Sequence, residues 1–151
     1  MTPSLVETIA AAKAAGNLAA VVEQIPYARW LGLTGKVLDG ELIVSMQYAP
    51  HLVGNPTIPA LHGGTLGALL ESAAIFAVLW HAEAVVLPKT ITITVDYLRS
   101  ATASDQILTH ACGVVTRFGR RVANVSVSAW QEDRKKPVAT ASAHFLVMAE
   151  T

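Results

Sequence analysis

Helical and strand-like periods alternate along the chain, beginning with a helical stretch. Residues 4–15 favour a helix, since Ser4 and Glu7 are spaced as a capping box and Gly16-Asn17 form a stop signal. A second short helix is expected through Val22, ending before Pro26. Residues 1–26 are therefore predicted to form a helical extension.

The next segment changes to the period of strands. Between Leu31 and Tyr48, apolar residues alternate on one face, and Asp39-Gly40 marks a hairpin turn. Residues 49–61 contain three prolines with Gly54 and Asn55, a composition that blocks both helix and central strand. We expect an ordered loop there.

A long apolar helix is predicted from about Leu61 to His81. Between Leu66 and Trp80 only Glu71 and Ser72 are clearly polar, so apolar residues occupy every face. Such a helix is expected to be buried all round. Its longest uninterrupted apolar run, residues 73–80, is too short to span a bilayer.

The remainder of the chain reads as four strands, at about residues 90–99, 106–117, 121–131 and 138–148. In the first of them, the residues predicted to share one face are Ile91, Ile93, Val95 and Tyr97. An α+β fold in which one antiparallel sheet wraps a long helix is the simplest packing of these elements.

Composition narrows the class of protein. The 151 residues are 52% hydrophobic and carry no formal net charge, so we expect one domain over residues 1–151 and neither a nucleic-acid nor a membrane partner. Cys112 is the single cysteine, which excludes an intrachain disulfide and fits a cytoplasmic location, as does the lack of a targeting signal. The five histidines show no metal-ligand spacing, so no metal is predicted.

Two features of the long helix suggest chemistry. Gly63 and Gly64 stand at its start, where free backbone N–H groups and the helix dipole favour negative charge, and Gly63 is the candidate donor to an oxyanion. Glu71 has no basic neighbour in the helix, and burial would raise its pKa towards that of a general base or nucleophile. Alternatively, the glycines only permit close packing, and the carboxylate bonds hydroxyls such as Thr90 or Thr65.

The stretch "LHGGTLGALLESAA" is similar to the His-Gly-Gly, six residues, acid pattern of hotdog-fold acyl-CoA thioesterases, the hydroxybenzoyl-CoA and phenylacetate-pathway group. "TITITVDYLRSA" resembles the family strand that ends in Tyr-Leu-Arg-Pro, with Ser100 in place of the proline. The resemblance implies a hotdog fold and hydrolysis of a thioester, with no cofactor because CoA is part of the substrate.

The resemblance also assigns roles to residues. Gly63 would polarise the carbonyl, Glu71 would activate water or attack the carbonyl, Thr90 would orient Glu71 or the water, and Asn55 would help to bind the thioester. Aspartate is usual in the phenylacetate-type relatives where Glu71 stands, so base and nucleophile both stay open. The loop between Asn55 and the helix is a residue longer than usual, which weakens the assignment of Asn55.

Other residues have two readings each. His62 borders the helix start, where it either orders the loop or contacts substrate. A group of arginines near strand ends either meets the phosphates of CoA or forms a solvated hairpin tip; these are Arg99, Arg117, Arg120 and Arg121.

The spacing of Gly63 and Glu71 has a consequence for assembly. Eight residues of helix put them about 12 Å apart along the axis, so one carbonyl cannot easily touch both. A homodimer with antiparallel helices solves this, as in the hotdog family, and a dimer of dimers is compatible with it. Two other functions stay open: a hydroxyacyl-CoA dehydratase or hydratase using His51 in "HLVGNPTIPA", and a non-catalytic acyl-CoA-binding domain.

Overall fold

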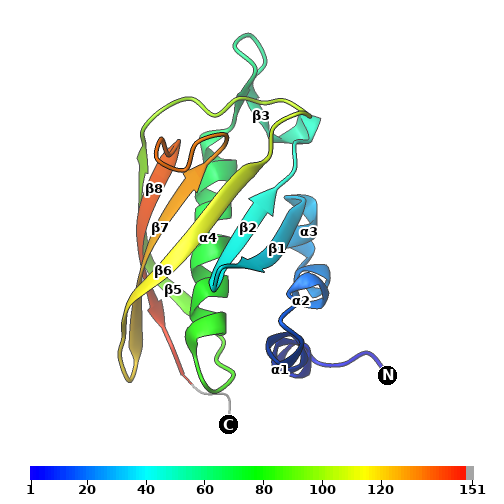
Figure 1. The fold of residues 1–151 in the computed structure, drawn as a ribbon, viewed down its shortest axis with the longest axis vertical. Coiled ribbons are helices and arrows are strands. Elements are labelled where there is room, and N and C mark those ends of the chain that lie inside the picture. The colour runs from blue at the N-terminus through cyan, green and yellow to red at the C-terminus, as the bar shows by residue number, and fades with distance from the viewer. Residues whose placement is uncertain (149–151) are drawn as a thin grey trace.

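The structure, a computed structural model, describes residues 1–148. It contains a central helix, three shorter N-terminal helices and a six-stranded antiparallel sheet (Figure 1). The helices are α1 (Leu5–Ala15), α2 (Ala19–Gln24), α3 (Pro26–Trp30) and α4 (Gly63–His81), with one 3-10 turn at Pro50–Leu52. The strands are β1 (Leu33–Leu38), β2 (Glu41–Met46), β3 (Val53–Asn55), β4 (Ala60–Leu61), β5 (Lys89–Tyr97), β6 (Thr109–Phe118), β7 (Val122–Trp130) and β8 (Ala139–Leu146).

The large sheet has the strand order β1-β2-β6-β7-β8-β5 and wraps α4, as the sequence pattern predicted. Figure 1 shows β2, β6 and β7 passing in front of the helix, with α1 to α3 beside β1. β1 and β5 are the two edges of this sheet. The residues of β7 and β8 alternate between buried and more exposed positions, so one face of the sheet packs on α4 and the other faces outward.

The N-terminal helices follow the predicted signals with one addition. Ser4 and Glu7 form both hydrogen bonds of the capping box, and Gly16 ends α1 in the left-handed conformation. The second helix, α2, ends at Gln24, before Pro26 as expected. Pro26 then begins a further helix, α3, because proline fits the first position of a helix, where no N–H is needed. Lys13 donates a hydrogen bond to the carbonyl of Ala82, which ties α1 to the end of α4.

The segment between β2 and α4 has more structure than the expected loop. It forms the 3-10 turn and the short ribbon β3–β4, since all three of its prolines lie outside the paired residues. A later segment holds this ribbon in place: Leu61 N–H donates to the carbonyl of Ala101, and Ala103 N–H donates to that of Pro59. Because β4 leads directly into α4, these two hydrogen bonds also hold the start of the helix in place.

Burial of α4 is incomplete on one side, contrary to the expectation of a helix buried all round. Ten of its residues are buried, but Gly64 is exposed and a stripe of half-buried residues follows it. The stripe recurs every three or four positions and comprises Gly67, Ala68, Glu71, Ser72 and Ile75. By length and composition α4 also resembles a membrane-crossing helix, although 56% of that window is buried within the fold.

The helix and the sheet come close together at Gly113 of β6. A Cβ atom there would come within 3.0 Å of Ala77 Cβ and 3.1 Å of the Ala73 carbonyl oxygen. Because protein interiors are packed to crystal-like density, neither neighbour has space to retreat. Gly113 is therefore required by packing rather than by backbone conformation.

Replacing Gly113 by valine is expected to lower the free energy of unfolding by about 2–3 kcal/mol, the usual range for overpacking a core. Urea unfolding followed by circular dichroism measures this. Ser126→Val, which adds bulk at an exposed position of β7, is the matched control and should change stability little. Equal stabilities of the two variants would show that α4 can move away from β6.

Candidate active site

The start of α4 leaves one backbone N–H free. His62 is the N-cap residue, and its Nδ1 accepts a hydrogen bond of 2.8 Å from the Gly64 N–H. The carbonyl of His62 accepts from Thr65 N at 2.9 Å and from the Thr65 hydroxyl at 2.6 Å. Within residues 1–148, the Gly63 N–H donates to no protein acceptor. The Gly63 N–H is thus free of protein acceptors, and its role as a donor to an oxyanion stays a prediction.

Gly64 serves the cap itself. A Cβ atom on Gly64 would lie 2.9 Å from His62 Nδ1, so a side chain there would displace the imidazole. Accepting this bond also requires Nδ1 to be unprotonated. The sequence left His62 between ordering the loop and contacting substrate, and the geometry supports the first of these.

Glu71 lies halfway along α4, on the half-buried stripe. Its Oε1 accepts a hydrogen bond of 2.6 Å from the Thr90 hydroxyl of β5. Across the described part of the chain the one salt bridge joins Arg134 to Glu41, so Glu71 has no cationic partner. The structure therefore brings Glu71 and Thr90 together, although Glu71 is less buried in the single protomer than the sequence suggested.

A β-bulge explains how Thr90 reaches the helix. Thr90 pairs with Phe145 and Thr92 with His144, so Ile91 is an extra residue in β5. Phe145 is fully buried on the helix side, and Thr90 therefore faces the same way. Ile93, Val95 and Tyr97 keep the predicted alternation, because each pairs with a buried alanine of β8. Ile91 breaks it, because it is the bulge residue and has no partner in β8.

Tyr97 also belongs to this region, although it was predicted only to share one face of its strand and not to take part in the site. Its hydroxyl donates a hydrogen bond of 2.8 Å to the carbonyl oxygen of Gly63. The aromatic ring also lies over Gly63, since a Cβ on that residue would be 3.3 Å from Tyr97 Cε1. The sequence signal that could have indicated this contact is the pair of glycines four residues apart, Gly63 and Gly67. Because neither has a side chain, one turn of the helix surface is open to the Tyr97 ring.

Asn55 lies at the end of β3, and its side-chain oxygen is already engaged. Oδ1 accepts from the Thr57 N–H at 3.0 Å, which shapes the turn between β3 and β4. The Asn55 side chain is exposed. The contact of Asn55 with the thioester stays a prediction, and the side-chain amide nitrogen is the group that could make it.

The four candidate arginines do not form one group. Arg99 N–H donates to the carbonyl of Val138, whereas Val147 N–H donates to that of Arg121. Val138 and Val147 flank β8, so at ~3.3 Å per residue the two arginines lie roughly 30 Å apart. The expected single set is thus divided between opposite ends of the sheet (Figure 1).

At the β6–β7 turn the remaining three arginines share one groove of about 340 Å³. A bulge at Thr116 shifts the register there, so that Arg117 pairs with Asn124 and Phe118 with the buried Ala123. Phe118 consequently packs on His81 at the end of α4, with ring centroids 5.3 Å apart. The arginine groove, lined by Arg117, Gly119, Arg120, Arg121, Val122 and Asn124, lies at the end of the molecule away from Gly63.

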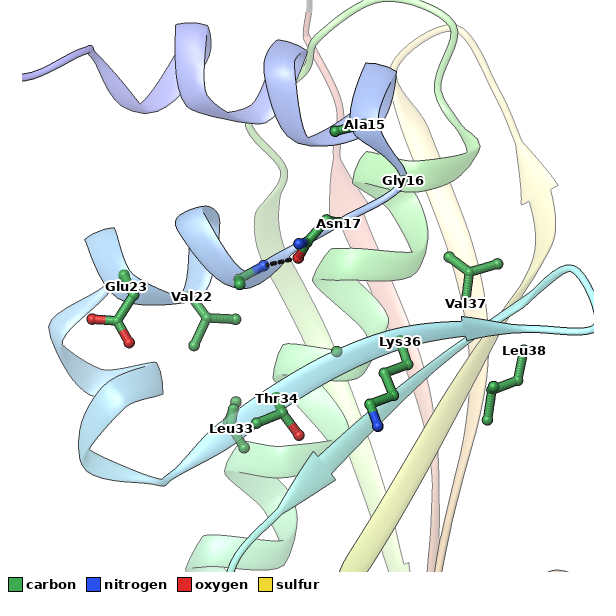
Figure 2. Close-up of a pocket in the computed structure, with 12 residues that line it drawn as sticks. Ala15, Gly16, Asn17, Val22, Glu23, Leu33, Thr34, Lys36, Val37 and Leu38 are labelled. Atoms are coloured by element: carbon green, nitrogen blue, oxygen red, sulfur yellow. Dashed lines mark hydrogen bonds between the residues drawn. The ribbon is translucent and has the colours of Figure 1, made fainter.

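The largest of the grooves described here lies away from Gly63 and Glu71. It has a volume of about 650 Å³ and separates β1 from the junction of α1 and α2 (Figure 2). Figure 2 shows Val22, Leu33 and Val37 among its labelled side chains, with Glu23 and Lys36 as the charged ones. Neither it nor three smaller grooves include Gly63, Glu71 or Thr90. In the single protomer Gly63 and Glu71 are half-buried and Thr90 is exposed.

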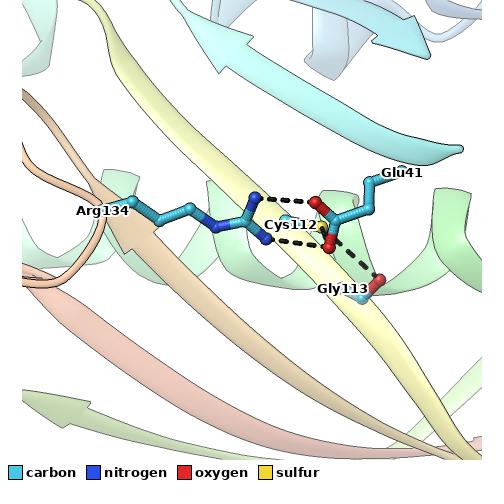
Figure 3. Close-up of polar contacts among 4 residues, drawn as sticks. All are labelled: Glu41, Cys112, Gly113 and Arg134. Atoms are coloured by element: carbon cyan, nitrogen blue, oxygen red, sulfur yellow. Dashed lines mark hydrogen bonds and ion pairs between the residues drawn. The ribbon is translucent and has the colours of Figure 1, made fainter. Parts of the chain in front are cut away.

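Cys112 belongs to a separate cluster on the outer face of the sheet. Arg134 binds Glu41 through two hydrogen bonds of 2.7 and 3.0 Å beside the thiol (Figure 3). Hydrogen bonding from Arg134 holds the pKa of Glu41 below its usual value, and burial raises the pKa of the Cys112 thiol. The thiol is therefore protonated at neutral pH, as expected of a core residue rather than a nucleophile.

No three metal-ligating side chains of the His, Cys, Asp or Glu type come together within residues 1–148. The groups that the structure places on α4 and the neighbouring β5 are the free Gly63 amide and the Glu71 carboxylate, with the Thr90 hydroxyl bound to Glu71. A free amide at a helix start can stabilise a developing oxyanion, and a carboxylate without a counter-charge can accept a proton.

Comparisons with known proteins identify the family and the fold of the chain. The sequence model of the thioesterase superfamily matches residues 59–138. The chain belongs to the thioesterase superfamily, and its architecture is the hotdog fold that the resemblance implied. No match was found among curated protein sequences.

Several solved structures share the fold over nearly the whole chain. A protein of Chromobacterium violaceum is 34% identical, with a TM-score of 0.75, and the match covers 94% of this chain and 97% of that one. A phenylacetic acid degradation-related protein of Ralstonia eutropha is 29% identical, with a TM-score of 0.70 and coverages of 82% and 91%. A Bacillus halodurans protein with CoA is 17% identical, with a TM-score of 0.72 and coverages of 100% and 98%.

Loss of the His62 cap should destabilise the protein by about 1 kcal/mol, because the Gly64 N–H would lose its acceptor. His62→Ala removes the acceptor, whereas His62→Asn keeps a side-chain oxygen at the N-cap and is the control. Urea unfolding compares the two variants with the wild type. Equal losses in both would assign the contribution of His62 to ring packing instead.

Proposed function

We propose that this protein is an acyl-CoA thioesterase that hydrolyses its substrate to a free acid and CoA. The observation that supports this most directly is the pairing of a free Gly63 N–H with an uncompensated Glu71 carboxylate held by Thr90. Membership of the thioesterase superfamily agrees with it, and the CoA in the Bacillus halodurans structure suggests the thiol carrier.

The proposed chemistry uses these groups in a fixed order. The Gly63 N–H binds the thioester oxygen and stabilises the oxyanion that forms on attack. Glu71 either takes a proton from the attacking water or attacks the carbonyl itself to form an anhydride that water then cleaves. In both routes the carbon–sulfur bond breaks and CoA leaves as the thiolate. Thr90 holds one carboxylate oxygen in either case.

A second copy of the chain is required to complete this site. Gly63 and Glu71 of one protomer are about 12 Å apart along α4, and the uncovered stripe of the helix contains Glu71. Small residues on the stripe, such as Gly67 and Ala68, permit another helix to come close. An antiparallel copy of α4 would place Gly63 of one subunit beside Glu71 of the other, at two equivalent sites.

The rival functions have weaker support. His51, the base of the hydratase alternative, has Nε2 2.9 Å from the carbonyl oxygen of Trp30, so that nitrogen carries a proton and donates it. Its ring also packs on Trp30, with centroids 4.4 Å apart. The non-catalytic alternative predicts binding of acyl-CoA without release of thiol, and the variants below test it.

The arginine groove at the β6–β7 turn is the proposed contact for the CoA phosphates. Three guanidinium groups around one groove suit phosphate, which accepts paired hydrogen bonds. In an antiparallel dimer the far end of one subunit approaches the helix start of the other, so the groove would serve the partner's Gly63. Arg99 then belongs to a different part of the surface.

Glu71→Gln is expected to lower kcat by about 100-fold or more while the fold stays intact, because the amide can neither accept the proton nor attack the carbonyl. Release of free thiol from acyl-CoA measures kcat. Glu83→Gln, the same change at an exposed position, is the control. Normal turnover by Glu71→Gln would refute the role of Glu71. If the wild type binds acyl-CoA but releases no free thiol, the non-catalytic alternative is favoured.

Mixed dimers test whether the site is shared. Subunits with Gly63→Pro lose the free N–H, and His62 already has the backbone angles that precede proline, with φ −64° and ψ 132°. Random mixing with Glu71→Ala subunits should restore about one quarter of wild-type activity, since half the dimers each hold one intact site.

Gly63→Ala is the control for the proline variant, because it adds the same Cβ beside Tyr97 but keeps the N–H. Subunit exchange is checked with tagged chains. Activity that stays at the level of the separate mutants, despite proven exchange, would contradict the shared site.

A further inference from the structure

The peptide groups on both sides of the Gly63 amide are held by side chains. The Gly63–Gly64 peptide has its carbonyl bound by the Tyr97 hydroxyl at 2.8 Å and its N–H bound by His62 Nδ1 at 2.8 Å. The preceding His62–Gly63 peptide has its carbonyl bound by Thr65. Only the Gly63 N–H among these groups is left free, so its direction is set by its neighbours.

We infer that Tyr97 is a positioning residue, whose hydroxyl fixes the Gly63 peptide so that the free N–H meets the thioester oxygen. This inference rests on the proposed function. Tyr97 acts through Gly63 and is not itself required to touch the substrate. The last residue of β5 thereby links the edge strand to the helix start.

The surroundings of Tyr97 favour an ordered hydroxyl. The ring lies over Gly63, and a Cβ on Gly67 would be 3.5 Å from the hydroxyl oxygen. Gly63 and Gly67, one helical turn apart and without side chains, thus form the surface on which the Tyr97 ring packs. The backbone of Tyr97 is held as well, because it pairs with the fully buried Ala139 of β8.

A backbone donor without such a support would have more freedom. Glycine has the least restricted backbone of all residues, and two glycines in sequence begin this helix. Oxyanion stabilisation depends on donors that are already in place when charge develops. The hydroxyl of Tyr97 compensates for the flexibility that the glycine pair introduces.

Tyr97→Phe tests the inference because it keeps the ring and removes only the hydroxyl. We expect kcat for acyl-CoA to fall about five- to tenfold, as for the loss of one hydrogen bond, with KM nearly unchanged. Tyr27→Phe is the matched control: Tyr27 is 54% exposed and Tyr97 is 55% exposed, but Tyr27 lies in α3 and is stacked on Trp30. It should leave kcat unchanged.

A second measurement does not depend on activity. The amide ¹H–¹⁵N signals of Gly63 and Gly64 should shift in Tyr97→Phe and stay in place in Tyr27→Phe. If the wild type releases thiol and Tyr97→Phe has a normal kcat, Tyr97 does not position the donor. A lower free energy of unfolding of Tyr97→Phe would then show that Tyr97 has a structural role. If the wild type releases no thiol, the proposed function fails, and unshifted glycine signals would overturn the inference as well.

Discussion

The close packing of α4 on the sheet depends on small residues at the facing positions. Gly113 of β6 faces Ala73 and Ala77 of the helix, with no space for a Cβ atom between them. Buried alanines of β6, β7 and β8 continue this surface, namely Ala111, Ala123, Ala129, Ala139, Ala141 and Ala143. Because α4 approaches the sheet this closely, six strands can curve around it. The side of α4 that the sheet leaves uncovered then lies next to the edge strand β5.

The position of the candidate site follows from that packing. Because the sheet covers the other sides of α4, the stripe with Glu71 lies towards the edge strand β5. Two contacts then join this strand to the helix: Thr90 binds Glu71 near the start of the strand, and Tyr97 binds Gly63 at its end. One edge strand therefore supports both chemical groups, although they are about two helical turns apart.

Local signals made much of this fold predictable. The capping box at Ser4, the Asp39-Gly40 turn and the long apolar helix each depend on a few neighbouring residues, and the structure contains all three. The glycine pair and Glu71 were likewise found from the physics of helix ends and buried carboxylates. Such features need no knowledge of distant contacts.

Non-local features were harder to predict. The alternation along β5 gave no sign of an extra residue at Ile91. Thr90 was connected with Glu71 only as one of two possible hydroxyl partners and through the family resemblance, and the structure shows that the partner is Thr90. The second helix does end before Pro26, but the additional helix α3 that begins at this proline was not predicted. Spacing along the chain also does not reveal which end of a sheet an arginine occupies, and Arg99 was grouped with residues about 30 Å away for that reason. Where the free side of α4 and the edge of β5 meet, the single chain leaves surface that its own residues do not cover, and the proposed two-fold axis would cover it with the same surface of a second chain. In that proposed dimer each helix would contribute its start to one site and its middle to the other, which would explain why an amide and a carboxylate too far apart to act together are both held in place within one chain.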